Sequence, residues 1–165
     1  MDAKAKRNYS FKKAASLING IVAETLTDMA RYQNEAMQTN LDESKDIDDK
    51  SFTSLKKSTL EIRKKRGQGT LALDTGKTGR RKKLRGLKNI PAKKSNLVSK
   101  VVMTASYGVY HNRGFVTAAD SMIPGKKVPA RNWFGITKDM RPDGRKYKVY
   151  VRMTLMKIAK SLRKL

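Results

Sequence analysis

The sequence predicts an α+β fold, with amphipathic helices towards both ends of the chain and a strand between them. Apolar residues recur every three or four positions over residues 10–38 and again within residues 147–165, as expected for helices that bury one face. Apolar and polar residues alternate over residues 97–107, which is typical of a strand. The length of 165 residues predicts a single domain, residues 1–165.

The N-terminal helix is expected to run from about Ser10, a residue type that caps helices, to Gln38. Gly20 lowers the helix propensity without ending the apolar pattern. The face opposite the apolar stripe carries both signs of charge, so we expect the stripe to form core or a subunit contact. The stripe consists of Leu17, Ile18, Ile21, Val22, Leu26, Met29 and Tyr32.

Residues 40–95 are expected to be rich in loops and, from residue 56, strongly basic. They begin with an acidic loop, residues 40–50, whose alternating acids resemble a calcium-binding loop. The pattern lacks the central glycine and the closing glutamate of an EF-hand, so no metal site is predicted. A short basic helix is expected over residues 58–66, where two following glycines end it.

Residues 97–137 are expected to form the strand and a long loop after it. The strand places Leu97, Val101, Met103 and Ala105 on one face. Within the loop, residues 133–136 form an apolar cluster that has to dock in a core, and residues 141–144 have the composition of a turn. The C-terminal helix is expected over residues 147–165, with an apolar stripe at Val151, Leu155, Ile158, Leu162 and Leu165.

The formal net charge of the chain is +24, and it is unevenly distributed along the sequence. Residues 1–50 carry a net charge of −1, whereas residues 51–165 carry +25. Such charge predicts a polyanionic or acidic partner, and because no aromatic residues interleave with the clusters, any nucleic-acid contact would be to phosphates. The contact candidates are Arg63, Lys64, Lys65 and Arg66 in one cluster, and Arg80, Arg81, Lys82, Lys83 and Arg85 in the other.

The composition argues against most classes of enzyme. The chain has no cysteine, which excludes disulfides, thiolate metal sites and thiol nucleophiles, and its one histidine is His111. No apolar run approaches the roughly 20 residues of a membrane span, and the N-terminus lacks the apolar segment of a secretory signal. We therefore expect no cofactor and no membrane partner.

Two short motifs resemble parts of enzyme signatures. Gly76-Lys77-Thr78 matches the end of a phosphate-binding P-loop, but Leu71 stands where the loop needs its first glycine. Asp74-Thr75-Gly76 matches the core of an aspartic protease signature, and a dimer would pair two Asp74 carboxylates. The neighbouring basic run would keep both carboxylates ionised, so we interpret this motif as a turn.

His111 has no serine or carboxylate at a spacing that indicates a catalytic triad, so a packing or hydrogen-bonding role is expected. The sequence as a whole therefore predicts a protein that is not an enzyme. A dimeric aspartic protease stays as an alternative that Asp74→Asn would test.

Four blocks of sequence occur in a recognisable order. The long helix is followed by residues 52–59 and an Arg/Lys-rich turn, then by Leu71-Ala72-Leu73-Asp74-Thr75-Gly76-Lys77, then by residues 105–114, and finally by Val128-Pro129-Ala130-Arg131-Asn132-Trp133-Phe134-Gly135-Ile136. In this order the blocks resemble the virion-morphogenesis and tail-completion family of tailed bacteriophages, which includes the Mu-like G proteins. Together they cover about residues 10–165.

The resemblance implies a small domain in which the helices pack on an antiparallel sheet. It implies that the Thr-Gly motif is a structural turn, that His111 ends a strand before a glycine turn, and that a Pro-Ala-Arg segment fixes a loop against the sheet. The residues with implied structural roles are Asp74, Thr75, Gly76, Tyr107, His111, Gly114, Pro129, Ala130, Arg131, Trp133 and Phe134.

The resemblance also implies a function in the virion, where the protein would complete the tail or join the tail to the head at the neck. The implied assembly is a ring of identical subunits, often six-fold, whose copies meet through two different surfaces. The basic loops would then contact neighbouring tail or neck proteins, or packaged DNA without reading its sequence. The alternative from composition is a generic basic nucleic-acid-binding protein, associated with ribosomes or with packaging.

Overall fold

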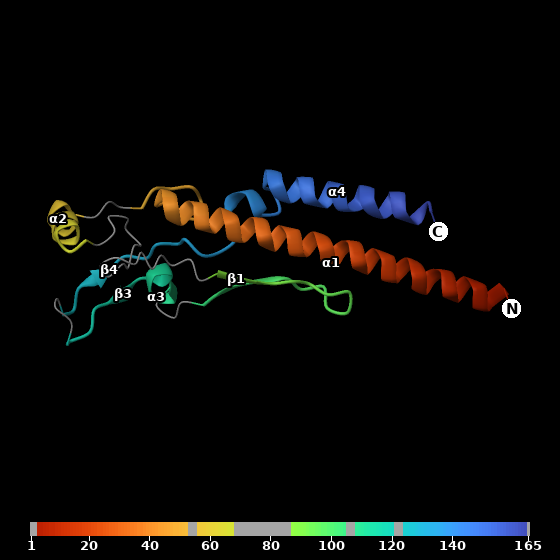
Figure 1. Ribbon diagram of the computed structural model, residues 1–165, viewed down its shortest axis with the longest axis horizontal. Helices are drawn as coiled ribbons and strands as arrows, with labels where there is room; N and C mark the ends of the chain where they lie inside the picture. Colours follow the sequence, from red (N-terminus) through yellow and green to blue (C-terminus); the bar gives the residue numbers. More distant parts are fainter. Residues whose placement is uncertain (1–2, 53–55, 68–86, 105–107, 121–123, 165) are drawn as a thin grey trace. The chain divides into compact units, whose positions relative to one another are not determined.

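The computed structural model describes residues 3–52, 56–67, 87–104, 108–120 and 124–164, and it confirms the α+β class with a long N-terminal and a C-terminal helix (Figure 1). The helices are α1 (Ala3–Glu43), α2 (Lys57–Lys65), α3 (Gly108–Arg113) and α4 (Arg145–Leu162), with a short 3₁₀ helix, η1 (Lys138–Met140). The strands are β1 (Leu87–Ile90), β2 (Lys100–Met103), β3 (Phe115–Val116) and β4 (Lys127–Val128).

Helix α1 is longer at both ends than the predicted span of residues 10–38, so Ser10 lies inside it and is not its cap. The C-terminal extension has a clear cause, because Leu41 is buried and its burial favours continuing the helix. The helix ends where Ser44 takes a positive φ of 57°. There the N–H of Lys45 bonds the carbonyl of Asn40, and the N–H of Ser44 bonds that of Leu41, which is the Schellman pattern of helix termination.

Helices α2 and α4 lie close to where the sequence placed them. Helix α2 begins and ends one residue earlier than predicted, and Gly67 follows it with a positive φ of 61°. Helix α4 begins two residues earlier than predicted and ends at Leu162. The predicted turn before it is present, since the N–H of Gly144 bonds the carbonyl of Arg141 at 2.8 Å.

The strands form two small antiparallel sheets, β1–β2 and β3–β4. In the second sheet Phe115 pairs with Val128 and Val116 with Lys127. Strand β2 covers only the centre of the predicted strand at residues 97–107, although Val101 and Met103 are its more buried positions, as predicted.

The prediction that His111 ends a strand is wrong. The backbone of residues 108–113 is helical, and His111 lies within α3. Gly108, the first residue of that helix, is buried so tightly against the Met103 side chain that there is no room for a Cβ. A glycine packed against a β2 side chain thus marks the start of a helix, where the sequence suggested a turn after a strand.

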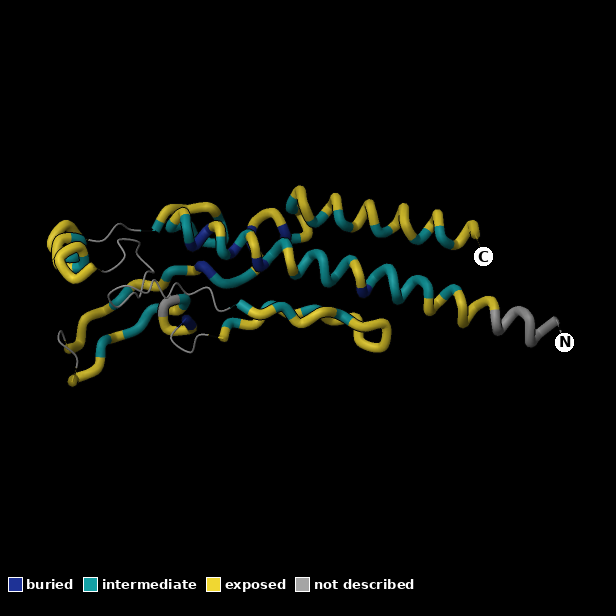
Figure 2. Tube along the Cα trace, viewed as in Figure 1, coloured by how far each residue is buried: buried dark blue, intermediate teal, exposed yellow. Residues whose placement is uncertain are grey.

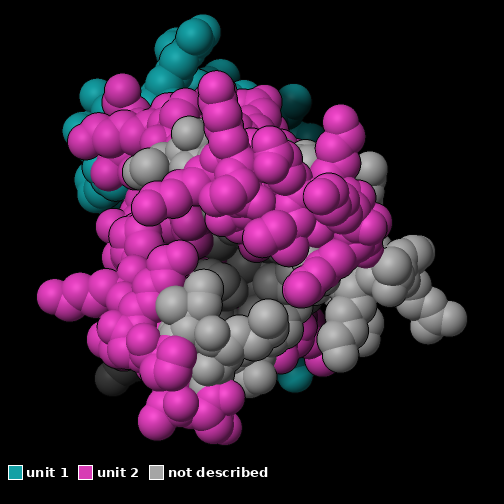
Figure 3. All heavy atoms as spheres, turned by 90° about the vertical axis from the view of Figure 1, so that its left-hand side faces the viewer, with its two compact units in different colours: residues 1–33, 89–101, 139–165 teal, residues 34–88, 102–138 magenta. Residues whose placement is uncertain are grey.

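The chain divides into two compact units (Figure 3). Unit 1 consists of residues 1–33, 89–101 and 139–165, and unit 2 consists of residues 34–88 and 102–138. Helix α1 contributes its first three quarters to unit 1 and the remainder to unit 2. The single domain expected from the length stays a prediction.

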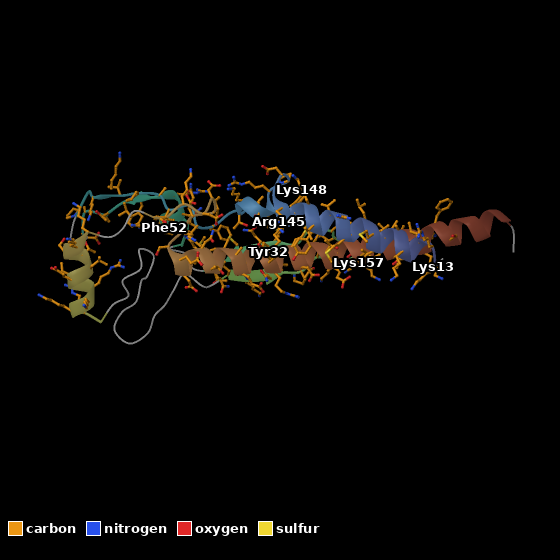
Figure 4. All side chains as sticks on the ribbon, turned by 90° about the horizontal axis from the view of Figure 1, so that it is seen from above. Lys13, Tyr32, Phe52, Arg145, Lys148 and Lys157 are labelled. Carbon is orange, nitrogen blue, oxygen red and sulfur yellow. The ribbon has the colours of Figure 1, made fainter. Side chains whose placement is uncertain are left out.

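In unit 1, α4 runs antiparallel beside α1 (Figures 1 and 4). The Thr154 hydroxyl donates to the Thr25 hydroxyl at 2.9 Å, and the rings of Tyr150 and Tyr32 meet edge to face. The segment after β1 also packs on α1, where the N–H of Ala92 donates to a threonine hydroxyl at 3.1 Å. The predicted α1 stripe is only partly buried by these neighbours, so the core of unit 1 is thin.

Unit 2 is built around Trp133, which is completely buried. It packs with Leu41 from the end of α1, and the predicted docking of the apolar cluster at residues 133–136 in a core is confirmed for this side chain. Phe52, Leu87, Met103 and Phe134 surround the pair. The four surrounding side chains come from four different segments of unit 2, so their packing fixes the path of the loops between them.

Candidate binding surfaces and the loop that supports them

The segments of the third and fourth sequence blocks meet in unit 2 through Asn112. The N–H of Phe134 donates to Asn112 Oδ1 at 3.0 Å, and Asn112 Nδ2 donates to the Phe134 carbonyl at 3.2 Å. One side chain of α3 therefore satisfies both backbone groups of a residue 22 positions away. Sequence reasoning missed Asn112, because an asparagine inside a short helix carries no signal of such a distant partner.

Gly114 lies directly under the segment that contains Pro129 and Ala130. A Cβ on Gly114 would stand 2.8 Å from the backbone nitrogen of Ala130 and 2.9 Å from the carbonyl oxygen of Val128. Its φ of 75° is also one that other residues rarely adopt. The close approach places the Pro-Ala-Arg segment against the junction of α3 and β3.

Arg131 is half-buried, and the structure brings it near Arg63 of α2. Burial lowers the pKa of the Arg131 guanidinium, and the positive charge of Arg63 lowers it further. Among the residues that the structure describes, no carboxylate forms an ion pair with Arg131. A half-buried cation beside a second cation is a place where an anion would be stabilised.

The first basic cluster lies on α2 and just after it. Lys64, Lys65 and Arg66 are exposed, and Arg63 is partly buried. Glu61 is the one acidic residue in the sequence of this helix. The cluster thus presents a positive surface to solvent, with Arg63 linking it to Arg131.

A third basic feature, in unit 1, was not expected from the sequence. Lys12 and Lys13 of α1 and Lys94 from the segment between β1 and β2 line a hollow of about 470 Å³. The stem of Lys94 crosses α1 at Gly20, where a Cβ would stand 3.0 Å from Lys94 Cε. Gly20 was the one sequence feature that could have indicated this contact, because a glycine within a long helix lets another segment approach closely.

The charged residues of helix α4 are all basic. It contains six Lys and Arg residues and no acidic residue. Two of the six interact with α1, since Lys157 Nζ lies 3.7 Å from a Glu24 carboxylate oxygen and Lys146 Nζ lies 5.3 Å from the centre of the Tyr32 ring. Figure 4 labels Lys157 and Tyr32. Arg145 and Lys148 mark the start of the helix in the same view.

Folding redistributes the charge that the sequence placed after residue 50. Unit 1 holds 18 Lys and Arg against 5 Asp and Glu, a net charge of +13. Unit 2 holds 20 against 9, a net charge of +11. Residues 1–33 contribute +3 of this charge in unit 1, and residues 139–165, which include α4, contribute +7.

The acidic loop after α1 is organised by Asp46. Its Oδ1 atom accepts the backbone N–H groups of Asp48 and Lys50 at 2.8 and 2.9 Å, so this carboxylate closes the loop on itself. Across the described ranges, no group of three His, Cys, Asp or Glu residues is placed to hold a metal ion. Within those ranges, too, no helix is both long and apolar enough to cross a membrane.

Several predicted residues lie outside the described residues. They are Asp74, Thr75, Gly76 and Tyr107 of the motifs, and Arg80, Arg81, Lys82, Lys83 and Arg85 of the second basic cluster. The structure places the backbone of His111 in α3. The candidate surfaces among the described residues are therefore the α2 cluster with Arg131 in unit 2 and, separately, the Lys12–Lys13–Lys94 hollow and α4 in unit 1.

The fold and these surfaces define an α+β protein with two compact, strongly basic units. No protein-family model, no curated protein and no solved structure matches the chain.

Proposed function

We propose that the protein is a structural, non-enzymatic subunit of a tailed-phage virion, which completes the tail or joins the tail to the head as part of a ring at the neck. The observation that carries the proposal is the meeting of two of its sequence blocks in unit 2. Asn112 forms two hydrogen bonds with the Phe134 backbone, and Gly114 packs against the backbone of Ala130, so the two blocks form one packed unit.

The roles of these residues support a structural protein over an enzyme. Asn112 bonds a backbone, Gly114 makes room for one, and Trp133 fills a core. Asn112 and Gly114 are committed to the backbone they contact, and Trp133 is completely buried, so the three serve the fold.

The proposed mechanism is electrostatic docking. The α2 cluster and the unit 1 surfaces would attract acidic faces of adjacent virion proteins, or pass near packaged DNA without reading its sequence. Such docking accelerates assembly and fixes the orientation of the partners, but it weakens as salt rises because exposed charges are screened. The ring itself would form through two different surfaces of each copy.

The test is negative-stain imaging of the purified protein and of purified virions, combined with the mass of the particles in solution at low and moderate salt. We expect rings of uniform diameter and the protein at the tail end or neck of the particle. A protein that is strictly monomeric at every salt concentration and absent from particles would overturn the proposal.

Nucleic-acid binding is a second candidate, favoured by the net positive charge of both units. Binding of duplex DNA with a steep dependence on salt is expected under either function, so it does not separate them. Tight, steeply salt-dependent binding without rings at any salt concentration would favour the second candidate. Rings that form without nucleic acid would favour the first.

A further inference from the structure

Helix α4 leaves a large apolar surface unpartnered among the described residues. Its inner side contacts α1 through Tyr150 and Thr154, but much of its outer side is exposed (Figure 2). Leu155 and Met156 are each 62% exposed. The other exposed large apolar side chains of the helix are Val149, Val151, Met153 and Leu162. By their helical spacing, Val151, Leu155 and Leu162 share one side of α4, and Val149, Met153 and Met156 share another. Exposed apolar side chains that share a helix side indicate a contact surface, whereas single exposed ones are ordinary.

Part of this surface is a shallow hollow of about 340 Å³ along one side of the helix. Its lining residues are Tyr147, Lys148, Val151, Arg152, Leu155 and Met156. They form two rows at four-residue spacing, one of Tyr147, Val151 and Leu155, and the other of Lys148, Arg152 and Met156. Neighbouring rows on a helix form the ridge and groove into which another helix packs.

We propose that this groove of α4 binds an acidic amphipathic helix of a partner protein. The apolar side chains of the partner would lie along Val151, Leu155 and Met156, and its carboxylates would pair with Lys148 and Arg152. Charge complementarity selects this occupant, because α4 has six basic residues, no acidic one, and a single ion pair with α1 in the described structure.

Two other occupants fit the groove less well. A bilayer that filled the groove would have to accommodate Lys148 and Arg152, which line it together with the apolar side chains. A second copy of α4 would bring its own six basic residues against these two, and like charges in contact oppose binding. An acidic helix supplies both the apolar contact and the opposite charge.

The inference does not depend on the proposed place in a virion, because it concerns the surface of the isolated protein. Its test uses the full chain and a synthetic helical peptide of the same length as α4, with Leu and Glu at alternating helical rows. Binding is measured by fluorescence anisotropy of the labelled peptide at low and moderate salt. The competing probes are a peptide of the same composition in scrambled order, vesicles of phosphatidylglycerol, and duplex DNA.

The helix provides matched pairs of variants. Arg152→Glu and Met156→Ser change the groove, whereas Lys160→Glu and Met153→Ser make the same kinds of change on α4 outside it. We expect each groove variant to weaken peptide binding about tenfold. Each matched control is expected to change it less than about threefold, through long-range charge alone. Circular dichroism confirms that all four variants keep their helix content.

The proposal is supported if the ordered peptide binds more tightly than the scrambled one and the loss is confined to the groove variants. It is overturned if the ordered peptide does not bind, or if the control variants lose as much as the groove variants. It is also overturned if vesicles or DNA bind with the same dependence on Arg152 and Met156, because a membrane or a nucleic acid would then be the occupant.

Discussion

Asn112 and Phe134 are joined by two hydrogen bonds, one in each direction between the side-chain amide of Asn112 and the backbone of Phe134. The pair connects α3 to the segment that carries Trp133, the buried centre of unit 2. An asparagine amide has the donor and the acceptor that a backbone peptide group requires, so it acts here like a neighbouring strand.

Replacing Asn112 by alanine is expected to lower the free energy of unfolding by about 2 kcal/mol, because two partly buried backbone groups of Phe134 lose their partner. Asn112→Asp keeps the acceptor for the Phe134 N–H but sets a carboxylate oxygen against the Phe134 carbonyl, so it should not restore the stability that the alanine variant loses. The measurement is chemical denaturation followed by Trp133 fluorescence. Asn132→Ala is the matched control, since the Asn132 side chain is exposed. An equal loss of stability in both alanine variants would contradict the role given to Asn112.

Gly114 and Gly125 both have a positive φ, so replacing each by alanine distinguishes the cost of backbone strain from the cost of a steric clash. Gly125 has a φ of 66° and open space where a Cβ would lie, so Gly125→Ala should cost about 1 kcal/mol from its conformation alone. Gly114 has a similar φ but faces the Ala130 nitrogen at 2.8 Å, so Gly114→Ala should cost clearly more. The midpoints of thermal unfolding of the two variants compare them directly. Equal midpoints would mean that the segment at Ala130 moves away without cost.

The contact between Thr154 and Thr25 is expected to help hold α4 on α1. Thr154→Val and Thr25→Val should show a coupling energy of about 0.5–1 kcal/mol in a double-mutant cycle, because either change removes the same hydroxyl–hydroxyl bond. Thr27 is the control, since its hydroxyl accepts the N–H of Ala92 instead. A cycle between Thr154 and Thr27 should be additive, and coupling of the same size there would refute the specific contact.

Arg63 is expected to affect stability and binding in opposite directions. Its charge opposes the charged form of the half-buried Arg131, so Arg63→Gln should raise the free energy of unfolding by a few tenths of a kcal/mol after solvent screening. The same change should weaken the binding of a polyanion such as heparin or duplex DNA and reduce the salt slope by about 1.

Lys64→Gln provides the comparison for Arg63→Gln. Lys64 is exposed on the same helix, so its removal should weaken polyanion binding to a similar extent without any gain in stability. Denaturation and salt titrations of the two variants give both readouts. A stability gain of the same size for Lys64→Gln would show that general repulsion on α2, rather than the pair with Arg131, is responsible.

The helices were predictable because their evidence is local. The spacing of apolar residues located α1 and α4, the two glycines after residue 66 located the end of α2, and the turn composition located residues 141–144. The boundaries were less certain where tertiary burial decides them, as at Leu41, which extends α1 beyond Gln38. The helical backbone at His111 was missed because Gly108 packs against Met103 of β2, and no pattern of neighbouring residues indicates that contact.

The sequence by itself determined α1, α2, α4 and the total charge of this protein, since helix periodicity and composition depend on neighbours along the chain. Only the tertiary structure decided which elements share a surface. It placed the six basic residues of α4 beside α1, and it brought Arg63 near Arg131 across 68 positions of sequence. The physical reason is that charge and apolar surface act through space, so their effect depends on contacts between segments that the order of residues does not specify.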